Sequence, residues 1–123
     1  MNKTQRIKKS EEIELVIKER KVTAGDNFII YKKENHNPEG PRFALSVPKK
    51  FGIAVKRNQI KRRVRSIFDS LNIKKEFDVF VVIKVKANTL DFNNINTELS
   101  NLFIKAGLVE EKWLKEETFF LLF

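Results

Sequence analysis

The sequence contains no cysteine and a single histidine, and both scarcities restrict the chemistry of the chain. Without cysteine there can be no disulfide, no thiolate metal ligand and no cysteine nucleophile. His36 lies in a polar loop with no second imidazole to build a metal site. The acidic pairs at 11–12, 110–111 and 116–117 are adjacent residues, which point apart on a helix, so we expect solvated carboxylates there. We therefore predict no catalytic group and no metal held by the protein alone.

Long apolar runs are also missing. No run approaches the roughly twenty apolar residues that a membrane-spanning helix needs. The chain is strongly basic and shows no signal peptide, so we expect a cytoplasmic protein without a membrane association. Its 123 residues, 41% of them apolar, favour one folded domain.

The end of the chain is set apart from this domain. We expect a domain over residues 1–107 and a C-terminal apolar tail over 108–123, which closes with five consecutive apolar residues from Phe119 to Phe123. Such a run needs burial. Docking on the domain, a dimer contact and another partner are all open for it.

Acidic residues are absent from Gly40 to Phe68, and this gap coincides with the most basic part of the chain. Nine Lys or Arg fall between Arg42 and Arg65, as many as the formal net charge of +9 of the whole protein. One intense patch on an otherwise neutral domain is typical of a surface that binds a polyanion, here a nucleic acid. The alternative is a solvated helix face, because charge runs are common on protein surfaces.

The residues within this run repeat at helical spacing and separate into two faces. An apolar arc predicts packing on a core, and it is formed by Ile60, Val64, Ile67, Phe68 and Leu71. A polar arc lies roughly opposite, formed by Asn58, Lys61, Arg62 and Arg65, and we call these four residues the stripe. Lys56 and Arg57 lie in the entry turn, beside backbone amides that favour a phosphate.

Around this helix the chain alternates strands and helices in the order αβββαβα. A first helix is expected from Ser10, which we expect to act as its N-cap, after a basic, extended or mobile arm over residues 1–9. Strands are expected at 21–23, 27–33, 42–47 and 78–85, the last apolar on both faces and hence internal. A third helix should begin at Asp91 as N-cap and end at Gly107. This is an α+β fold of helices on a four-stranded sheet.

One stretch resembles a known family. The chain reads Ser46-Val47-Pro48-Lys49-Lys50-Phe51-Gly52-Ile53-Ala54-Val55, followed by Lys56-Arg57-Asn58-Gln59-Ile60-Lys61-Arg62. This resembles the signature of the protein component of bacterial ribonuclease P, and a weaker resemblance extends from about Arg6 to Gly107. It implies a ribonuclease P protein-like two-layer sandwich, also described as ribosomal protein S5 domain 2-like. It further implies a left-handed βαβ crossover, against the usual right-handed rule.

The resemblance also implies where RNA binds. The helix-opening Arg-Asn and the basic residues after it would contact the catalytic RNA, which gives Arg57, Asn58, Lys61, Arg62 and Arg65 here. We expect RNA contacts also from the basic residues just before them, Lys49, Lys50 and Lys56. Gln59 departs from the basic residue that is usual at its position, so one phosphate contact is expected to be missing.

A second site implied by the resemblance is a cleft between the first helix and the sheet, which holds the 5′ leader of precursor tRNA. Tyr31 matches the aromatic strand residue of the family, and Ile29 shares its strand face. Ile13 and Ile17 stand where many members carry Phe, and core packing is the open alternative for both. Because Ile cannot stack on a base, we expect a looser or differently selective grip on the leader.

The resemblance thus implies a subunit of the ribonuclease P endoribonuclease, in which the RNA and its Mg²⁺ supply the chemistry and the protein binds RNA. One protein is expected per RNA. The alternative is a stand-alone RNA-binding module, such as a ribosomal protein or RNA chaperone, that has no catalytic RNA partner.

Overall fold

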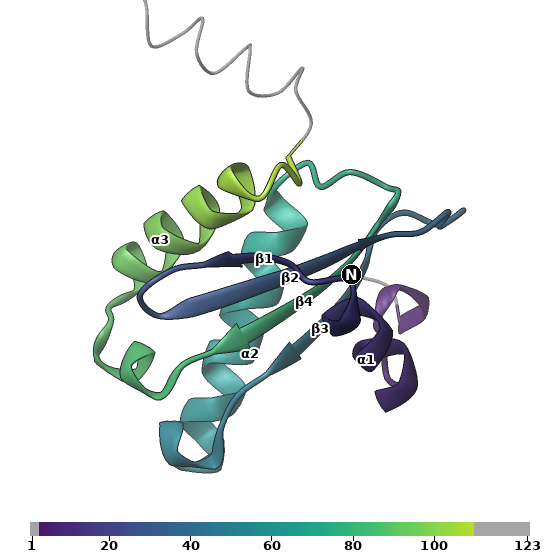
Figure 1. Cartoon of the computed structure of the whole chain (residues 1–123). Coiled ribbons are helices and arrows are strands. Elements are labelled where there is room, and N and C mark those ends of the chain that lie inside the picture. Colours follow the sequence, from purple (N-terminus) through teal and green to yellow (C-terminus); the bar gives the residue numbers. More distant parts are fainter. Residues whose placement is uncertain (1–2, 110–123) are drawn as a thin grey trace, which may run out of the picture.

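The computed structural model describes residues 3–109, which form a mixed four-stranded sheet with three α-helices (Figure 1). The elements are α1 (Ser10–Lys18), β1 (Lys21–Ala24), β2 (Phe28–Glu34), β3 (Arg42–Ser46), α2 (Ala54–Ser70), β4 (Phe77–Ile83) and α3 (Phe92–Lys105). Short 3₁₀ turns lie at Lys3–Gln5, Lys49–Phe51 and Val85–Thr89. The predicted order and the α+β fold are confirmed.

The strand order across the sheet is β1-β2-β4-β3. β2 pairs antiparallel with β1 and with β4, whereas β3 pairs parallel with β4. Because β3 and β4 are parallel and consecutive, α2 forms the crossover between them. β4 lies inside the sheet, as its apolar sequence predicted, and the left hand of the crossover stays a prediction from the resemblance.

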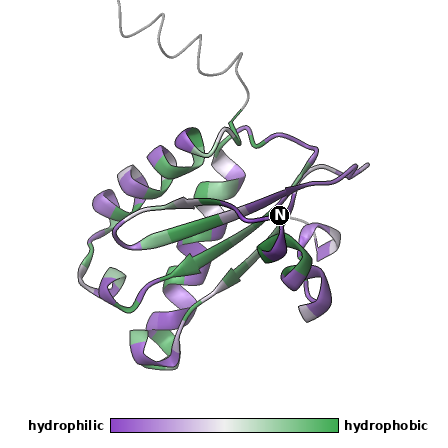
Figure 2. Ribbon diagram, viewed as in Figure 1, coloured by the Kyte–Doolittle hydropathy of each residue, from purple (hydrophilic) through white to green (hydrophobic). Residues whose placement is uncertain are grey.

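The main core lies between the sheet and the two longer helices. Alternate residues of β2 and β4, among them Phe28, Ile30, Val79 and Val81, face α2 and α3. Phe68 of α2 lies between two other rings, with its centroid 4.5 Å from that of Phe43 and 6.0 Å from that of Phe103. In Figure 2, α2 alternates between hydrophobic and hydrophilic along its length, as expected for a helix with one buried face.

Within residues 3–109, α1 and Ile7 of the N-terminal arm pack on the opposite face of the sheet. A smaller cluster there consists of Ile7, Val16, Ala44 and Phe80, with Ile13, Tyr31 and Val82 packed against it. The sheet with α2 and α3 therefore makes up the two layers of the predicted sandwich, and α1 lies on the other side of the sheet (Figure 1).

Helix α3 begins after Asp91 and ends before Gly107, the two end residues predicted from the sequence. The Asp91 carboxylate accepts a 2.8 Å hydrogen bond from the backbone N–H of Asn94, which makes Asp91 the N-cap. At the other end Gly107 has φ +74°, and its N–H donates to the Ile104 carbonyl while the N–H of Leu108 donates to that of Phe103. This pair of bonds is a Schellman motif, which requires the left-handed backbone that glycine adopts at little cost.

At the N-terminal end the expected N-cap was wrong, whereas the arm is extended at residues 6–7, one of the two forms expected for it. The backbone of Arg6 and Ile7 forms a parallel bridge along β3, where the N–H of Ile7 donates to Phe43 at 2.8 Å and Ile7 is buried. The bridge and the burial of Ile7 hold this part of the arm, which covers backbone groups of the edge strand β3. Ser10 is the first helical residue, and Lys9 takes the N-cap position without a side-chain bond.

The start of the predicted tail belongs to the folded core. Leu108 and Val109 are buried, and Val109 forms a β-bridge with Ile73 beyond the end of α2. The rest of the tail, including the apolar run from Phe119 to Phe123, lies outside the described residues. The division into a domain and a tail stays a prediction.

Candidate nucleic-acid interface

The stripe lies on the face of α2 that points away from the sheet. Ile60 and Val64 turn the other side of the helix into the core, and the helical period then directs the stripe outwards. Its four residues line one shallow hollow: Asn58, Lys61, Arg62 and Arg65. The structure thus brings together the residues that the pattern grouped, and none of the side chains lining this hollow is acidic.

The N-terminal arm extends this basic surface, which the sequence did not predict. A neighbouring hollow lies between Arg6 and Lys8 of the arm, Lys61 and Arg65 of α2, and strand β3. Burial, and secondarily the charge of Arg6, lowers the pKa of the Arg65 guanidinium. Arg65 still remains protonated at neutral pH, since guanidinium groups lose their proton only at very high pH. A bound phosphate would relieve the repulsion between Arg6 and Arg65.

The basic residues at the entry of α2 are spread over a wider surface than the stripe. Lys49 and Lys50 are exposed in the 3₁₀ turn that precedes α2, and Lys56 is exposed in its first turn. The Arg57 Nε donates to the Gly52 carbonyl at 3.2 Å, a bond that fixes the guanidinium beside the turn. The two terminal nitrogens of Arg57 carry four further N–H groups that can serve a phosphate.

The four residues of the predicted leader cleft lie on the α1 side of the sheet. Ile13 is half-buried and packs against the small cluster beneath α1, as Tyr31 does. Ile17 is 39% exposed on α1. Tyr31 is half-buried, with its ring centroid 6.0 Å from that of Phe80 in a stacked arrangement. Ile29 is half-buried two residues before Tyr31 on the same strand face.

Strand pairing adds two apolar residues to this surface. Val22 of β1 and Phe80 of β4 are the direct partners of Tyr31 on either side, so the three side chains form a row across the sheet. Val22 is 46% exposed. The sequence did not single out either residue, because a register between separate strands cannot be read from local periodicity.

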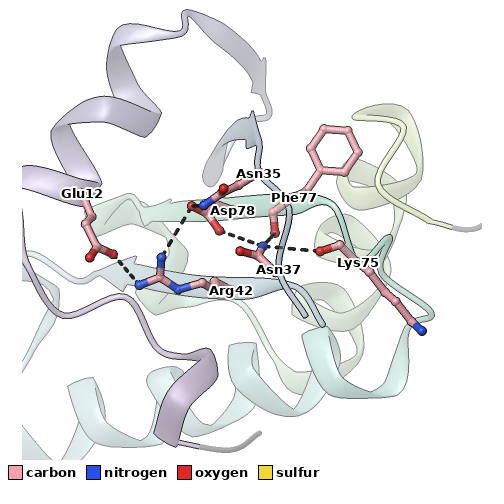
Figure 3. A network of polar contacts seen from close by, with 7 residues as sticks. All are labelled: Glu12, Asn35, Asn37, Arg42, Lys75, Phe77 and Asp78. Atoms are coloured by element: carbon pink, nitrogen blue, oxygen red, sulfur yellow. Dashed lines mark hydrogen bonds and ion pairs between the residues drawn. The ribbon is translucent and has the colours of Figure 1, made fainter. Parts of the chain in front are cut away.

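A polar network joins α1 to the sheet next to this surface (Figure 3). Arg42 of β3 forms an ion pair with Glu12 of α1 and a longer one, 3.9 Å, with Asp78 of β4. The Asp78 carboxylate is 4% exposed and accepts 3.0 Å hydrogen bonds from the side-chain amides of Asn35 and Asn37. The network thus fixes both the start of α1 and the loop after β2.

Residues 3–109 also lack the features of two other classes of site. That range contains no group of three or more His, Asp or Glu residues placed to hold a metal ion. None of its helices is long and apolar enough to cross a membrane.

Comparisons with known proteins assign the family. The family model described as ribonuclease P matches residues 1–107 of this chain. The chain belongs to the ribonuclease P protein family. The ribonuclease P protein component of Bacillus pumilus is 36% identical over 114 residues, which cover 91% of this chain and 96% of that one.

Solved structures of ribonuclease P proteins share the fold. The RNase P protein of Staphylococcus aureus has a TM-score of 0.76 at 29% identity, covering 86% of this chain and 98% of that chain. The RNase P protein of Thermotoga maritima has a TM-score of 0.70 at 31% identity, covering 79% of this chain and 93% of that chain. Membership of this family supports a protein subunit of the ribonuclease P endoribonuclease and favours it over a stand-alone RNA-binding module.

Proposed function

We propose that this chain binds the ribonuclease P RNA through the stripe of α2 and the adjoining arm. The observation that carries the proposal is the continuous basic surface formed by Arg6, Lys8 and the stripe, whose two hollows are lined by no acidic side chain. Arginine offers a planar fork for phosphate oxygens, and Asn58 can both donate and accept. Lys49, Lys50, Lys56 and Arg57 extend the contact along the RNA backbone at the entry of α2.

The α1 side of the sheet is the proposed contact for the 5′ leader of precursor tRNA. Tyr31 supports this role because its ring is half-buried beside the exposed Val22, on a strand face that also carries Ile29. Ile17 can add apolar contact from α1, but it offers no ring for base stacking. The grip on the leader should therefore depend mainly on Tyr31.

In this arrangement the RNA and its bound Mg²⁺ ions cleave the phosphodiester that releases the leader, and the protein contributes position and charge. We place the Mg²⁺ ions mainly on the RNA. Positive charge on the protein offsets phosphate repulsion, so the assembled particle should need less Mg²⁺ than the RNA alone. We expect one protein per RNA, in the cytoplasm.

Binding to the organism's own ribonuclease P RNA at several salt concentrations tests this interface. The double variant Lys61→Gln/Arg62→Gln should bind more weakly, and its log-log salt slope should fall by roughly 0.7–0.9 for each lost phosphate contact. Lys105→Gln, an exposed cation at the end of α3, is the matched charge control and should leave the slope unchanged. Equal slopes for the double variant and the wild type would remove the stripe from the interface.

A further inference from the structure

An exposed aromatic ring lies beside the RNA-binding helix, on its other flank. Phe92, the first residue of α3, is 46% exposed, whereas every other phenylalanine within residues 3–109 is buried. The guanidinium carbon of Arg63 lies 3.4 Å from the centroid of this ring. Phe92 and Arg63 therefore form a cation–π pair at the surface between α2 and α3.

Two hollows border this pair. The first is bounded by α2, the Val85–Thr89 turn and α3, and its lining includes Phe51, Lys56 and Asn88. The second is lined by Arg62 and Ser66 of α2. Gln59, Arg63 and Phe92 line both hollows, and no acidic side chain lines either. The ring therefore borders one hollow with a mixed apolar and polar lining and a second hollow whose other lining residues are polar or cationic.

The second hollow is continuous with the stripe. Arg62 lines it and also lines the stripe's own hollow, so one guanidinium borders both surfaces. An RNA strand whose phosphates lie on the stripe would therefore pass within reach of Phe92. Unpaired bases of RNA are recognised in this way, by stacking on aromatic rings or guanidinium planes and by hydrogen bonds to their edges.

We propose that the Phe92–Arg63 pair binds an unpaired nucleobase of the RNA whose backbone lies on the stripe. This inference rests on the proposed function, because it needs RNA on α2. The base stacks against the pair, and the side-chain amide of Gln59, which both donates and accepts, contacts its edge. The site adds a base contact to an interface that otherwise depends on phosphates.

The test measures the affinity of the full chain for the ribonuclease P RNA of the same organism, together with chemical probing of that RNA. Phe92→Leu, which keeps an apolar side chain but removes the ring, should weaken binding about tenfold, the scale of one lost base stack. Its salt slope should stay that of the wild type, because no phosphate contact is lost. Phe92→Tyr should retain the affinity. Asn101→Ala, an exposed position of the same helix, is the control and should change nothing.

Chemical probing supplies the second readout. At least one unpaired nucleotide should be protected by the wild type and by Phe92→Tyr, and should become reactive with Phe92→Leu. Weaker binding without a change at any unpaired nucleotide would overturn the base contact. Unchanged affinity with a lower thermal unfolding midpoint would also overturn it, since the ring would then be covered by the chain itself. If Lys61→Gln/Arg62→Gln still loses affinity in either case, the proposed function stands without this site.

Discussion

Replacing Asp78 by alanine tests the role of the polar network that fixes α1 and the loop after β2. The substitution removes a carboxylate that is 4% exposed and accepts hydrogen bonds from Asn35 and Asn37, each at 3.0 Å. It also removes the 3.9 Å ion pair with Arg42. Asn35, Asn37 and Arg42 each lose an acceptor, and a small cavity is left beneath the loop after β2.

The cost follows from these contacts. A hydrogen bond to a charged group contributes about 1.5–3 kcal/mol, and breaking a buried ion pair costs about 3–5 kcal/mol. The cost should lie at the lower end of these two ranges. Asn35 and Asn37 are half-buried and can regain water, and Arg42 keeps Glu12 as a partner. We expect Asp78→Ala to lower the free energy of unfolding by about 2–4 kcal/mol.

Urea unfolding of the full chain at neutral pH measures this loss. With a slope of about 2 kcal/mol per molar urea, the midpoint should fall by about 1–2 M. Hydrogen exchange adds a local readout, and the amides of α1 should exchange faster because Arg42 is then held from one side only. Glu76→Ala, an exposed acid two residues earlier, is the matched control and should leave the midpoint nearly unchanged.

A loss below about 1 kcal/mol would refute this reasoning, since it would put Asp78 in the range of a surface ion pair. The same conclusion would follow if Glu76→Ala cost as much as Asp78→Ala. Unchanged exchange in α1 despite a large global loss would show that the network stabilises the sheet without fixing the helix.

Four further substitutions have distinct expected results. Arg6→Gln should lower the log-log salt slope of RNA binding by roughly 0.7–0.9, and an unchanged slope would exclude the arm from the interface. Tyr31→Ala should reduce the preference for precursor over mature tRNA while leaving affinity for the ribonuclease P RNA near normal; equal losses for both ligands would contradict the cleft. Gly25→Ala should destabilise the fold by about 1–3 kcal/mol in urea unfolding, because its Cβ would lie 2.7 Å from Leu102 Cδ1. Gly52→Ala should cost less, since its new Cβ would meet a flexible lysine side chain at 3.2 Å, and equal costs would contradict the steric argument.

The features that local pattern specifies were predictable from the sequence. The two arcs of α2 follow from a period of 3.6 residues, and the structure buries Ile60 and Val64 while directing the stripe outwards. Asp91 and Gly107 were recognised as helix ends because capping depends on a few neighbouring residues. The continuous apolar sequence of β4 indicated its internal place in the sheet.

The features that depend on distant contacts were not predictable in this way. The arm shows no periodicity, so its bridge to β3 and the approach of Arg6 to Arg65 appear only in the folded chain. The pairing of Arg63 with Phe92 likewise requires the approach of two helices that are separate in the sequence. The packing of Ile13 and Tyr31 against one small cluster likewise depends on the approach of α1 to the sheet.

Cleavage of precursor tRNA by the organism's own ribonuclease P RNA at low Mg²⁺ tests the central claim most directly. The reaction is run with the RNA alone, with the protein alone, and with both together. We expect cleavage at the mature 5′ end only when RNA and protein are both present. An RNA whose activity is unchanged by the protein, or a protein that cleaves without the RNA, would contradict the account.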